Sequence, residues 1–271
     1  MKLAAVLCTH DVVSGALAIF SGSFEERAAK ARRMGFHGVE LMIRDPAALD
    51  AASIGATLRS HQLEVVQVIT GEIYGQDRLC LVTPIHDTYV RALERFRSVV
   101  NFAAPFGAYV NIGRFRGRLD WIKPPDVGYQ MALERIGEVA RFAAARGVKL
   151  TLEPINRYEV DFIMSTQDGL GFLRELGEPN VGLMLDLFHM NIEDSSIEKS
   201  LQEAWGAGVL WHVHIADSNR WHPGSGHIDF RHIIDCLHRM GYEGYLSAEI
   251  LPMPDPDTAA RETASYIGPM L

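Results

Sequence analysis

Eight short apolar runs recur along the chain, and they constrain its fold more than any other feature. Each run is rich in aliphatic residues, and a longer segment with helical patterning separates it from the next. This alternation is typical of β–α units that build a parallel sheet. The runs occupy residues 2–8, 38–43, 63–69, 108–113, 148–153, 181–186, 209–215 and 244–250.

The segments between the runs carry helix-end signals. SFEERAAKARRMG (23–35) begins with a Ser that can cap a helix, continues with acidic residues and ends in Gly, and DVGYQMALERIGEVARFAAARG (126–147) also ends in Gly. Eight such units in 271 residues predict an α/β fold, a (β/α)8 TIM barrel that forms a single domain over residues 1–271. A doubly wound open sheet is the alternative, but CTHDVVSG after the first run lacks the GxGxxG phosphate loop of that fold.

Charge and composition limit the partners. A net charge of −8 without a long Lys/Arg run argues against nucleic acid, so a small molecule is the expected ligand. Since no apolar run reaches the roughly 18 residues that span a bilayer, we expect no membrane association. MKLAAVLCTHDVV (1–13) is interpreted as a buried strand, because His10 and Asp11 end its apolar run too early for a signal peptide. Three cysteines without CxxC spacing predict reduced thiols and a cytoplasmic location.

The last four runs each carry, at or near the end, a residue that can bind a metal. These residues are Glu153, Asp186, His214 and Glu249. In a TIM barrel the carboxyl ends of the strands meet at one mouth, so we expect the four side chains to converge there. Three carboxylates in one place repel one another unless a cation lies between them. The set therefore predicts a divalent metal site, with Mn²⁺ as the most suitable ion and Mg²⁺, Co²⁺ or Zn²⁺ as substitutes.

The histidine of this set has an alternative two residues away in the sequence. A single Glu or His at the end of a strand is more often structural than functional, but four at equivalent positions are poorly explained by chance. His212 lies two residues before His214 and points to the same side of its strand. Geometry alone therefore leaves both histidines as candidates for the imidazole ligand.

Four segments carry a resemblance to a known family: LEPINRYEVDFI (152–163), LDLFHMNIED (185–194), HVHIADSNRWHPGSGHIDF (212–230) and SAEILP (247–252). They resemble the xylose-isomerase-like TIM barrels, in particular the ketose 3-epimerases of the tagatose/psicose type, and are most similar to the 5-keto-L-gluconate epimerase branch. The resemblance is strongest over residues 148–252. It implies metal binding by the four strand-end residues, and it implies His214 rather than His212, because in the family an arginine follows the ligand histidine by six residues. It further implies substrate contacts from Glu159, His189 and Arg220, and a homo-oligomer, either a dimer or a tetramer.

The expected reaction is inversion at C3 of a ketose or keto sugar acid. A cation that holds the carbonyl oxygen would stabilise the enediolate, while Glu153 and Glu249 on opposite faces of the substrate would remove a proton and return one. The same site could instead move a proton between C1 and C2, as in an aldose–ketose isomerase of the hydroxypyruvate or xylose isomerase type. An endonuclease-IV-like repair enzyme is a weaker alternative, since VITGE and NIGRF lack the histidines which that family has at these strand ends. A barrel that only binds a ligand is a third.

The segment GRFRGR (113–118) bears on the choice of substrate. We expect Arg114, Arg116 and Arg118 to lie on the side of the barrel where substrate binds, and arginine suits bidentate contacts with a carboxylate. The 5-keto-L-gluconate epimerase branch has a similar RGR, so we expect Arg116 and Arg118 to bind the carboxylate of an acidic keto sugar. The alternative is a solvated loop that binds nothing. In the loop after the seventh run, His227 and Asp229 are expected to be structural, with Asp229 as a helix cap.

Overall fold

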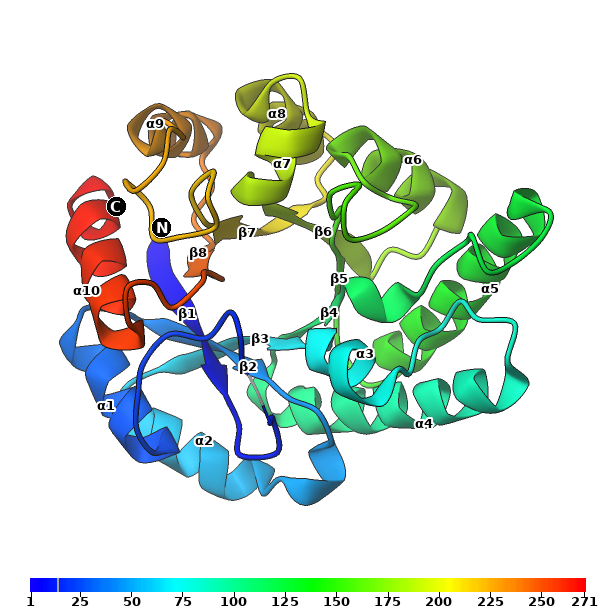
Figure 1. The fold of residues 1–271 in the computed structure, drawn as a ribbon, viewed down its shortest axis with the longest axis horizontal. Helices are drawn as coiled ribbons and strands as arrows, with labels where there is room; N and C mark the ends of the chain where they lie inside the picture. Colours follow the sequence, from blue (N-terminus) through cyan, green and yellow to red (C-terminus); the bar gives the residue numbers. More distant parts are fainter. Residues whose placement is uncertain (14) are drawn as a thin grey trace.

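A computed structural model describes residues 1–13 and 15–271, which form a closed barrel of eight parallel strands surrounded by helices (Figure 1). Each strand pairs with its neighbours in sequence, and β1 pairs with β8 to close the barrel. The predicted TIM barrel is confirmed, and each of the eight predicted runs contains one strand. The strands are β1 (Lys2–Cys8), β2 (Gly38–Met42), β3 (Glu64–Ile69), β4 (Tyr109–Ile112), β5 (Leu150–Leu152), β6 (Val181–Asp186), β7 (Leu210–Ile215) and β8 (Tyr245–Ala248).

Helices cover the outside of the barrel and add short segments at its mouth. Ser23 and Glu26 form a capping box at the start of α1, and Asp229 accepts a hydrogen bond from the His232 N–H at the start of α9, as predicted for Asp229. The helices are α1 (Phe24–Arg33), α2 (Ala51–Ser60), α3 (Gly71–Asp77), α4 (His86–Ala103), α5 (Pro125–Ala144), α6 (Thr166–Leu176), α7 (Leu187–Glu193), α8 (Ile197–Gly206), α9 (Phe230–Met240) and α10 (Pro256–Ile267).

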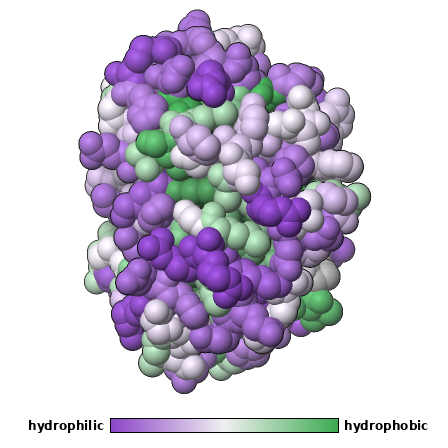
Figure 2. All heavy atoms as spheres, turned by 90° about the vertical axis from the view of Figure 1, so that its left-hand side faces the viewer, coloured by the Kyte–Doolittle hydropathy of each residue, from purple (hydrophilic) through white to green (hydrophobic). Residues whose placement is uncertain are grey.

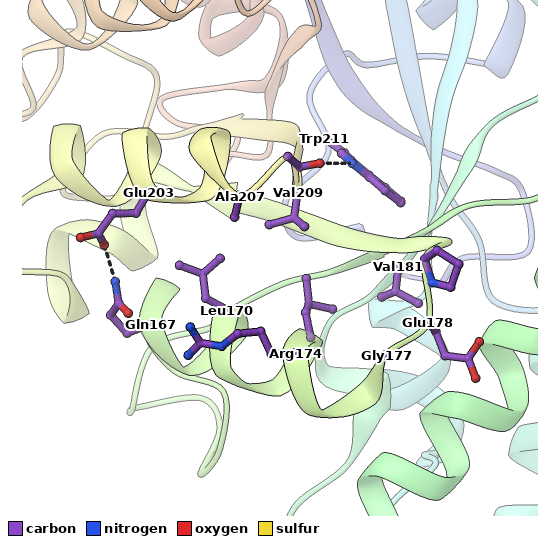
Figure 3. Close-up of a pocket in the computed structure, with 13 residues that line it drawn as sticks. Gln167, Leu170, Arg174, Gly177, Glu178, Val181, Glu203, Ala207, Val209 and Trp211 are labelled. Carbon is purple, nitrogen blue, oxygen red and sulfur yellow. Dashed lines mark hydrogen bonds between the residues drawn. The ribbon is translucent and has the colours of Figure 1, made fainter.

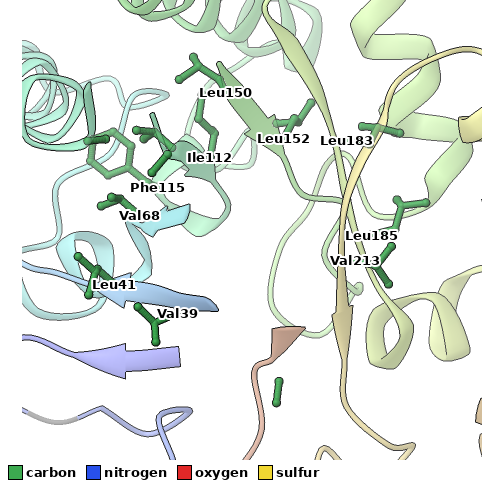
Figure 4. Packing of buried hydrophobic residues seen from close by; sticks show 14 of the residues in the cluster. Val39, Leu41, Val68, Ile112, Phe115, Leu150, Leu152, Leu183, Leu185 and Val213 are labelled. Atoms are coloured by element: carbon green, nitrogen blue, oxygen red, sulfur yellow. The ribbon is translucent and has the colours of Figure 1, made fainter. Parts of the chain in front are cut away.

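Most of the apolar core lies between the strands and the outer helices (Figure 4). Because side chains alternate along a strand, each strand also presents residues to the barrel interior. In β2, Val39 and Leu41 belong to the apolar core, whereas Glu40 between them bonds across the barrel to β7. The barrel is thus apolar on the outside and contains polar side chains within.

The outer surface has the character expected of amphipathic helices around a barrel. On the flank that carries α1 and α10, hydrophilic side chains cover most of the face, and hydrophobic ones gather near its middle (Figure 2). Among the helices of the described chain, none combines the length and the apolarity that crossing a membrane requires.

Candidate active site

A cavity of about 260 Å³ lies at the carboxyl ends of the strands. Its apolar wall includes Met42 at the end of β2 and Ile69 at the end of β3. Its polar wall contains several of the residues singled out from the sequence. The polar wall residues that bear on the chemistry are Asn111, Arg114, Glu153, Glu159, His189, Arg220 and Glu249.

A larger cavity of about 560 Å³ lies on the outside of the barrel, between α6 and α8 (Figure 3). Leu170, Val181 and Val209 line it, and a hydrogen bond from Gln167 to Glu203 joins the two helices beside it. Val181 begins β6 and Val209 precedes β7, so this cavity lies at the amino ends of the strands. Because TIM barrels place their catalytic groups at the opposite face, the smaller cavity is the candidate active site.

The four predicted metal ligands come together at this mouth. Asp186 is the last residue of β6, His214 lies in β7, and Glu153 and Glu249 directly follow β5 and β8. All four are buried, and one possible ligand atom from each lies within 4.8 Å of the others. Gly113 leaves room for this arrangement, since a Cβ on it would lie only 2.7 Å from Oε2 of Glu153.

Two atoms of the cluster have unsatisfied hydrogen-bonding capacity. Within the part of the chain that the structure describes, Oδ2 of Asp186 and Nδ1 of His214 are buried and have no hydrogen-bond partner. Buried polar atoms are nearly always paired, so both atoms have capacity left to bind a further partner at this site. Three carboxylates and one imidazole are a donor set that suits a divalent cation. The residues at this site therefore fit such an ion.

Glu40 separates the roles of the two histidines of β7. His212 Nε2 lies 2.6 Å from Glu40 Oε1, and His214 Nε2 lies 3.0 Å from the same oxygen. Only His214 also reaches the mouth, where its Nδ1 lies 3.6 Å from Oε2 of Glu249. The structure thus brings His214, and not His212, to the other three ligands, which spacing alone left open. Sequence reasoning did not identify Glu40.

The two glutamates of the cluster are electrostatically distinct. Burial and the charge of Glu249 raise the pKa of Glu153 to about 8. Burial also acts to raise the pKa of Glu249, but His214 and Arg220 lower it below its ordinary value. Arg220 Nη2 donates a hydrogen bond of 2.6 Å to Glu249 Oε2. One of the two carboxyl groups is therefore partnered by a cation of the protein and the other is not.

His189 is held in one orientation by Asn156, a residue that the sequence reasoning missed. Asn156 Oδ1 accepts the N–H of Tyr158, so its amide group donates to His189 Nδ1 at 2.7 Å. Burial and the charge of Arg220 lower the pKa of His189 well below its ordinary value, and the ring is neutral. Arg220 Nη1 lies 3.3 Å from the other ring nitrogen, Nε2, which also lies 3.6 Å from Oε1 of Glu153.

Arg220 reaches the site from the loop after β7. Its main-chain N–H donates to the carbonyl of Asp217, and its carbonyl accepts the N–H of Leu251. The Asp217 carboxylate accepts three backbone N–H groups of the same loop. With φ at 60°, Arg220 has a left-handed backbone conformation that these bonds hold in place. Glu159, the remaining predicted substrate residue, accepts a hydrogen bond from Asn156 beside the cavity.

The structure does not bring Arg116 and Arg118 to the cavity wall. Arg116 is fully buried, and both of its terminal nitrogens donate to backbone carbonyls. Arg118 forms an ion pair of 2.9 Å with Asp120. Arg114 of the same segment does line the cavity. Because residues 114–116 form a 3-10 turn, their side chains leave it in different directions, and Arg114 is the one that faces the cavity.

Comparisons with known proteins agree with this architecture. A family model described as xylose isomerase-like TIM barrel matches residues 28–269. A ketose 3-epimerase of Arthrobacter globiformis is 30% identical over 218 residues, which cover 79% of this chain and 73% of the relative. A 3-dehydro-D-guloside 4-epimerase of Escherichia coli K12 is 31% identical over 159 residues, which cover 57% of this chain and 60% of the relative. The solved structure of an L-ribulose 3-epimerase has a TM-score of 0.84 and 25% identity, with coverage of 100% of this chain and 94% of that one.

Proposed function

Because the chain belongs to the xylose isomerase-like TIM barrel family, we propose that it is a sugar epimerase that uses a divalent cation to invert C3 of a ketose or keto sugar acid. Carbohydrate epimerisation is the reaction class of its relatives. The observation that carries the metal dependence is the convergence of four ligand-type groups within 4.8 Å, two of which present unpaired buried atoms.

The cation would be held by Glu153, Asp186, His214 and Glu249. Mn²⁺ suits this donor set best, and Mg²⁺, Co²⁺ or Zn²⁺ could replace it. When bound, a cation supplies electrostatic stabilisation to the negative charge that develops as a proton leaves the carbon next to a ketone.

The protein's own carboxylates move the protons. Glu153 follows β5 and Glu249 follows β8, so the two reach the cavity from different parts of the barrel rim. One carboxylate removes the proton at C3, and the other returns a proton to the opposite face, which inverts the centre. Either can act first, depending on which epimer is bound.

Other side chains of the wall bind and orient the sugar. The guanidinium of Arg220 can donate to the oxygen that gains charge, His189 beside it can contact the sugar, and Glu159 can accept a hydroxyl hydrogen. Arg114 would bind the carboxylate of an acidic substrate, such as one resembling 5-keto-L-gluconate. Its availability supports this role, since among residues 1–13 and 15–271 no carboxylate forms an ion pair with Arg114 and no side-chain hydrogen bond holds it.

An aldose–ketose isomerase is the second candidate, because the same groups could move a proton between C1 and C2. The relatives also include a 4-epimerase, so inversion at C3 has to be distinguished by experiment from inversion at C4. The three outcomes differ in the carbon that exchanges its hydrogen with solvent.

The test is turnover in D₂O with neutral ketoses and with 5-keto-L-gluconate, followed by NMR. We expect deuterium at C3 of an epimeric product, loss of turnover after chelation, and recovery with Mn²⁺. Deuterium at C1 with an aldose product would favour the isomerase, deuterium at C4 would move the site of inversion, and full turnover by rigorously metal-free protein would refute the metal dependence.

A paired variant tests the carboxylate mechanism. Glu249→Gln should lower turnover by roughly 10²-fold or more, as expected for a positioned acid or base. Glu243→Gln is the matched control, because Glu243 is exposed at the other end of the same strand. A Glu249→Gln enzyme that binds metal and turns over normally would contradict the mechanism.

A further inference from the structure

Beneath the metal-ligand cluster, the barrel interior contains linked polar side chains that no step of the proposed reaction uses. Glu40 of β2 has no exposed surface, yet it is a carboxylate in the middle of an apolar strand. Its Oε1 lies 2.6 Å from His212 Nε2, and its two oxygens lie 3.0 and 3.1 Å from His214 Nε2. A buried carboxylate is costly unless it is well partnered, so its position between the two rings needs an explanation.

We propose that Glu40 is a positioning residue for the metal site: it accepts the Nε2–H of His214 and so presents the Nδ1 lone pair of that ring to the cation. The inference rests on the proposed function, since it concerns a ligand of the proposed metal.

The geometry of His214 supports this role on both sides of the ring. A neutral imidazole that donates through Nε2 has its lone pair on Nδ1, and metal-binding histidines commonly donate their other N–H to a carboxylate. Nδ1 of His214 is buried without a hydrogen-bond partner among the described residues, on the side of the ring that faces Glu249. The two contacts of similar length from Nε2 to the Glu40 oxygens restrict rotation of the ring.

Glu40 is itself held by other strands. Gln67 of β3 donates 2.9 Å to its Oε2, and Thr151 of β5 donates 2.6 Å to Gln67 Oε1. With His212 on Oε1, the carboxylate has donors on both oxygens besides His214. Donors from β3 and β7 therefore hold the group that orients the ligand, and Thr151 contacts only Gln67.

A second metal ion between Glu40, His212 and His214 is the competing explanation, since the three groups are of the right type. The separation of 2.6 Å between His212 Nε2 and Glu40 Oε1 is that of a direct hydrogen bond between the two groups, which favours a hydrogen-bonded pair over two ligands of one ion. The proposal therefore predicts one ion per chain.

The experiment is calorimetric titration of metal-stripped protein with Mn²⁺, with the thermal midpoint of each variant measured alongside. Glu40→Gln keeps nearly the same size but loses the charge, and we expect its Kd for Mn²⁺ to rise by roughly 10- to 100-fold. Thr151→Val is the matched control, because it removes a hydroxyl from the same buried network without touching Glu40 or His214. It should lower the thermal midpoint and leave the Kd within about twofold, since His214 keeps its partner.

The Mn²⁺ titration has several outcomes that would contradict the role of Glu40. If wild type binds Mn²⁺ and Glu40→Gln binds it equally well, Glu40 is not a positioning residue and the proposed function stands. If Thr151→Val weakens Mn²⁺ binding as much as Glu40→Gln does, the effect comes from general loosening of the buried network, and the inference is overturned. Two ions per chain in wild type, with one lost in Glu40→Gln, would overturn it as well. Wild type that binds no divalent ion overturns the proposed metal site and this inference with it. Should Glu40→Gln fail to fold, Glu40→Asp keeps the charge but withdraws it by one methylene, and its Kd should rise severalfold.

Discussion

The loops that follow β4 and β7 each carry an arginine with little exposed surface, and the two arginines have different partners. Arg116 donates only to backbone carbonyls, whereas Arg220 donates to the carboxylate of Glu249. Burial lowers the pKa of Arg116 to about 10. Burial also acts to lower the pKa of Arg220, but Asp186 and Glu249 raise it overall. Both arginines are largely or fully buried, so the difference between them lies in their partners, which are backbone carbonyls for Arg116 and side-chain carboxylates for Arg220.

The carbonyls that Arg116 binds explain what it does. They belong to Gly113 after β4, to Glu153 after β5, and to Phe162 and Ile163 further along the chain. Arg116 thereby ties together three backbone segments, one of which carries a proposed ligand and acid/base group. Its contribution to the active site is indirect, and the contrast with Arg220 can be tested by changing each in turn.

The largest expected effect is on turnover, from Arg220→Met. Loss of a donor to developing charge typically costs about 10²- to 10³-fold in kcat. The measurement is kcat of the Mn²⁺-loaded enzyme with its thermal midpoint as a control for folding. A variant with normal kcat would show that Arg220 serves the loop only, and the comparison with Arg116 would fail.

Arg116→Met should act on stability instead. Four carbonyls lose a charged donor, and we expect the free energy of unfolding to fall by about 3 kcal/mol. Chemical denaturation measures this loss, and kcat per folded molecule should fall far less than in Arg220→Met. If instead the variant is stable and fails to bind acidic substrates, Arg116 contacts substrate after all.

Arg114→Gln sharpens the comparison, because it tests the arginine of the same segment that lines the cavity. A charge-assisted hydrogen bond contributes about 1.5 kcal/mol or more, so KM for 5-keto-L-gluconate should rise roughly tenfold. KM for neutral ketoses should not change. Equal effects on both kinds of substrate would remove the support for an acidic substrate.

Arg118→Ala should have the smallest effect. Its side chain is 30% exposed and pairs with the exposed Asp120, and such pairs contribute about 0.5 kcal/mol or less. Stability and kcat/KM for acidic substrates should both stay within twofold of wild type. A rise in KM confined to acidic substrates would restore Arg118 to the substrate site, as its sequence context suggested.

The barrel and the convergence of the four strand-end residues could be predicted because both depend on local pattern. Apolar runs locate the strands, and the position of Glu153 or Asp186 at the end of a run places the side chain at the mouth. Spacing alone left His212 and His214 open, the family resemblance implied His214, and the register, in which His214 pairs with Asp186, is the physical reason that this histidine lies with the other three residues.

The remaining features depend on partners that are distant in sequence. Glu40 bonds to a histidine 172 positions away, and the carbonyls of Phe162 and Ile163 lie 46 and 47 positions beyond Arg116. A pattern within GRFRGR cannot show which arginine is buried, because three of the four carbonyls that hold Arg116 lie outside the segment. Asn156 was part of a quoted motif, but its role depends on the ring of His189, 33 positions further on.

Because Arg220 has a left-handed backbone conformation, selection for stability and selection for activity should favour different residues at this position. A residue with a Cβ pays about 1 kcal/mol or more in this conformation, and glycine pays almost nothing. A library randomised at position 220 and screened only for survival after heating would have a backbone reason to enrich glycine. The same library screened for sugar turnover should instead retain arginine, so the two screens should select different residues at one position.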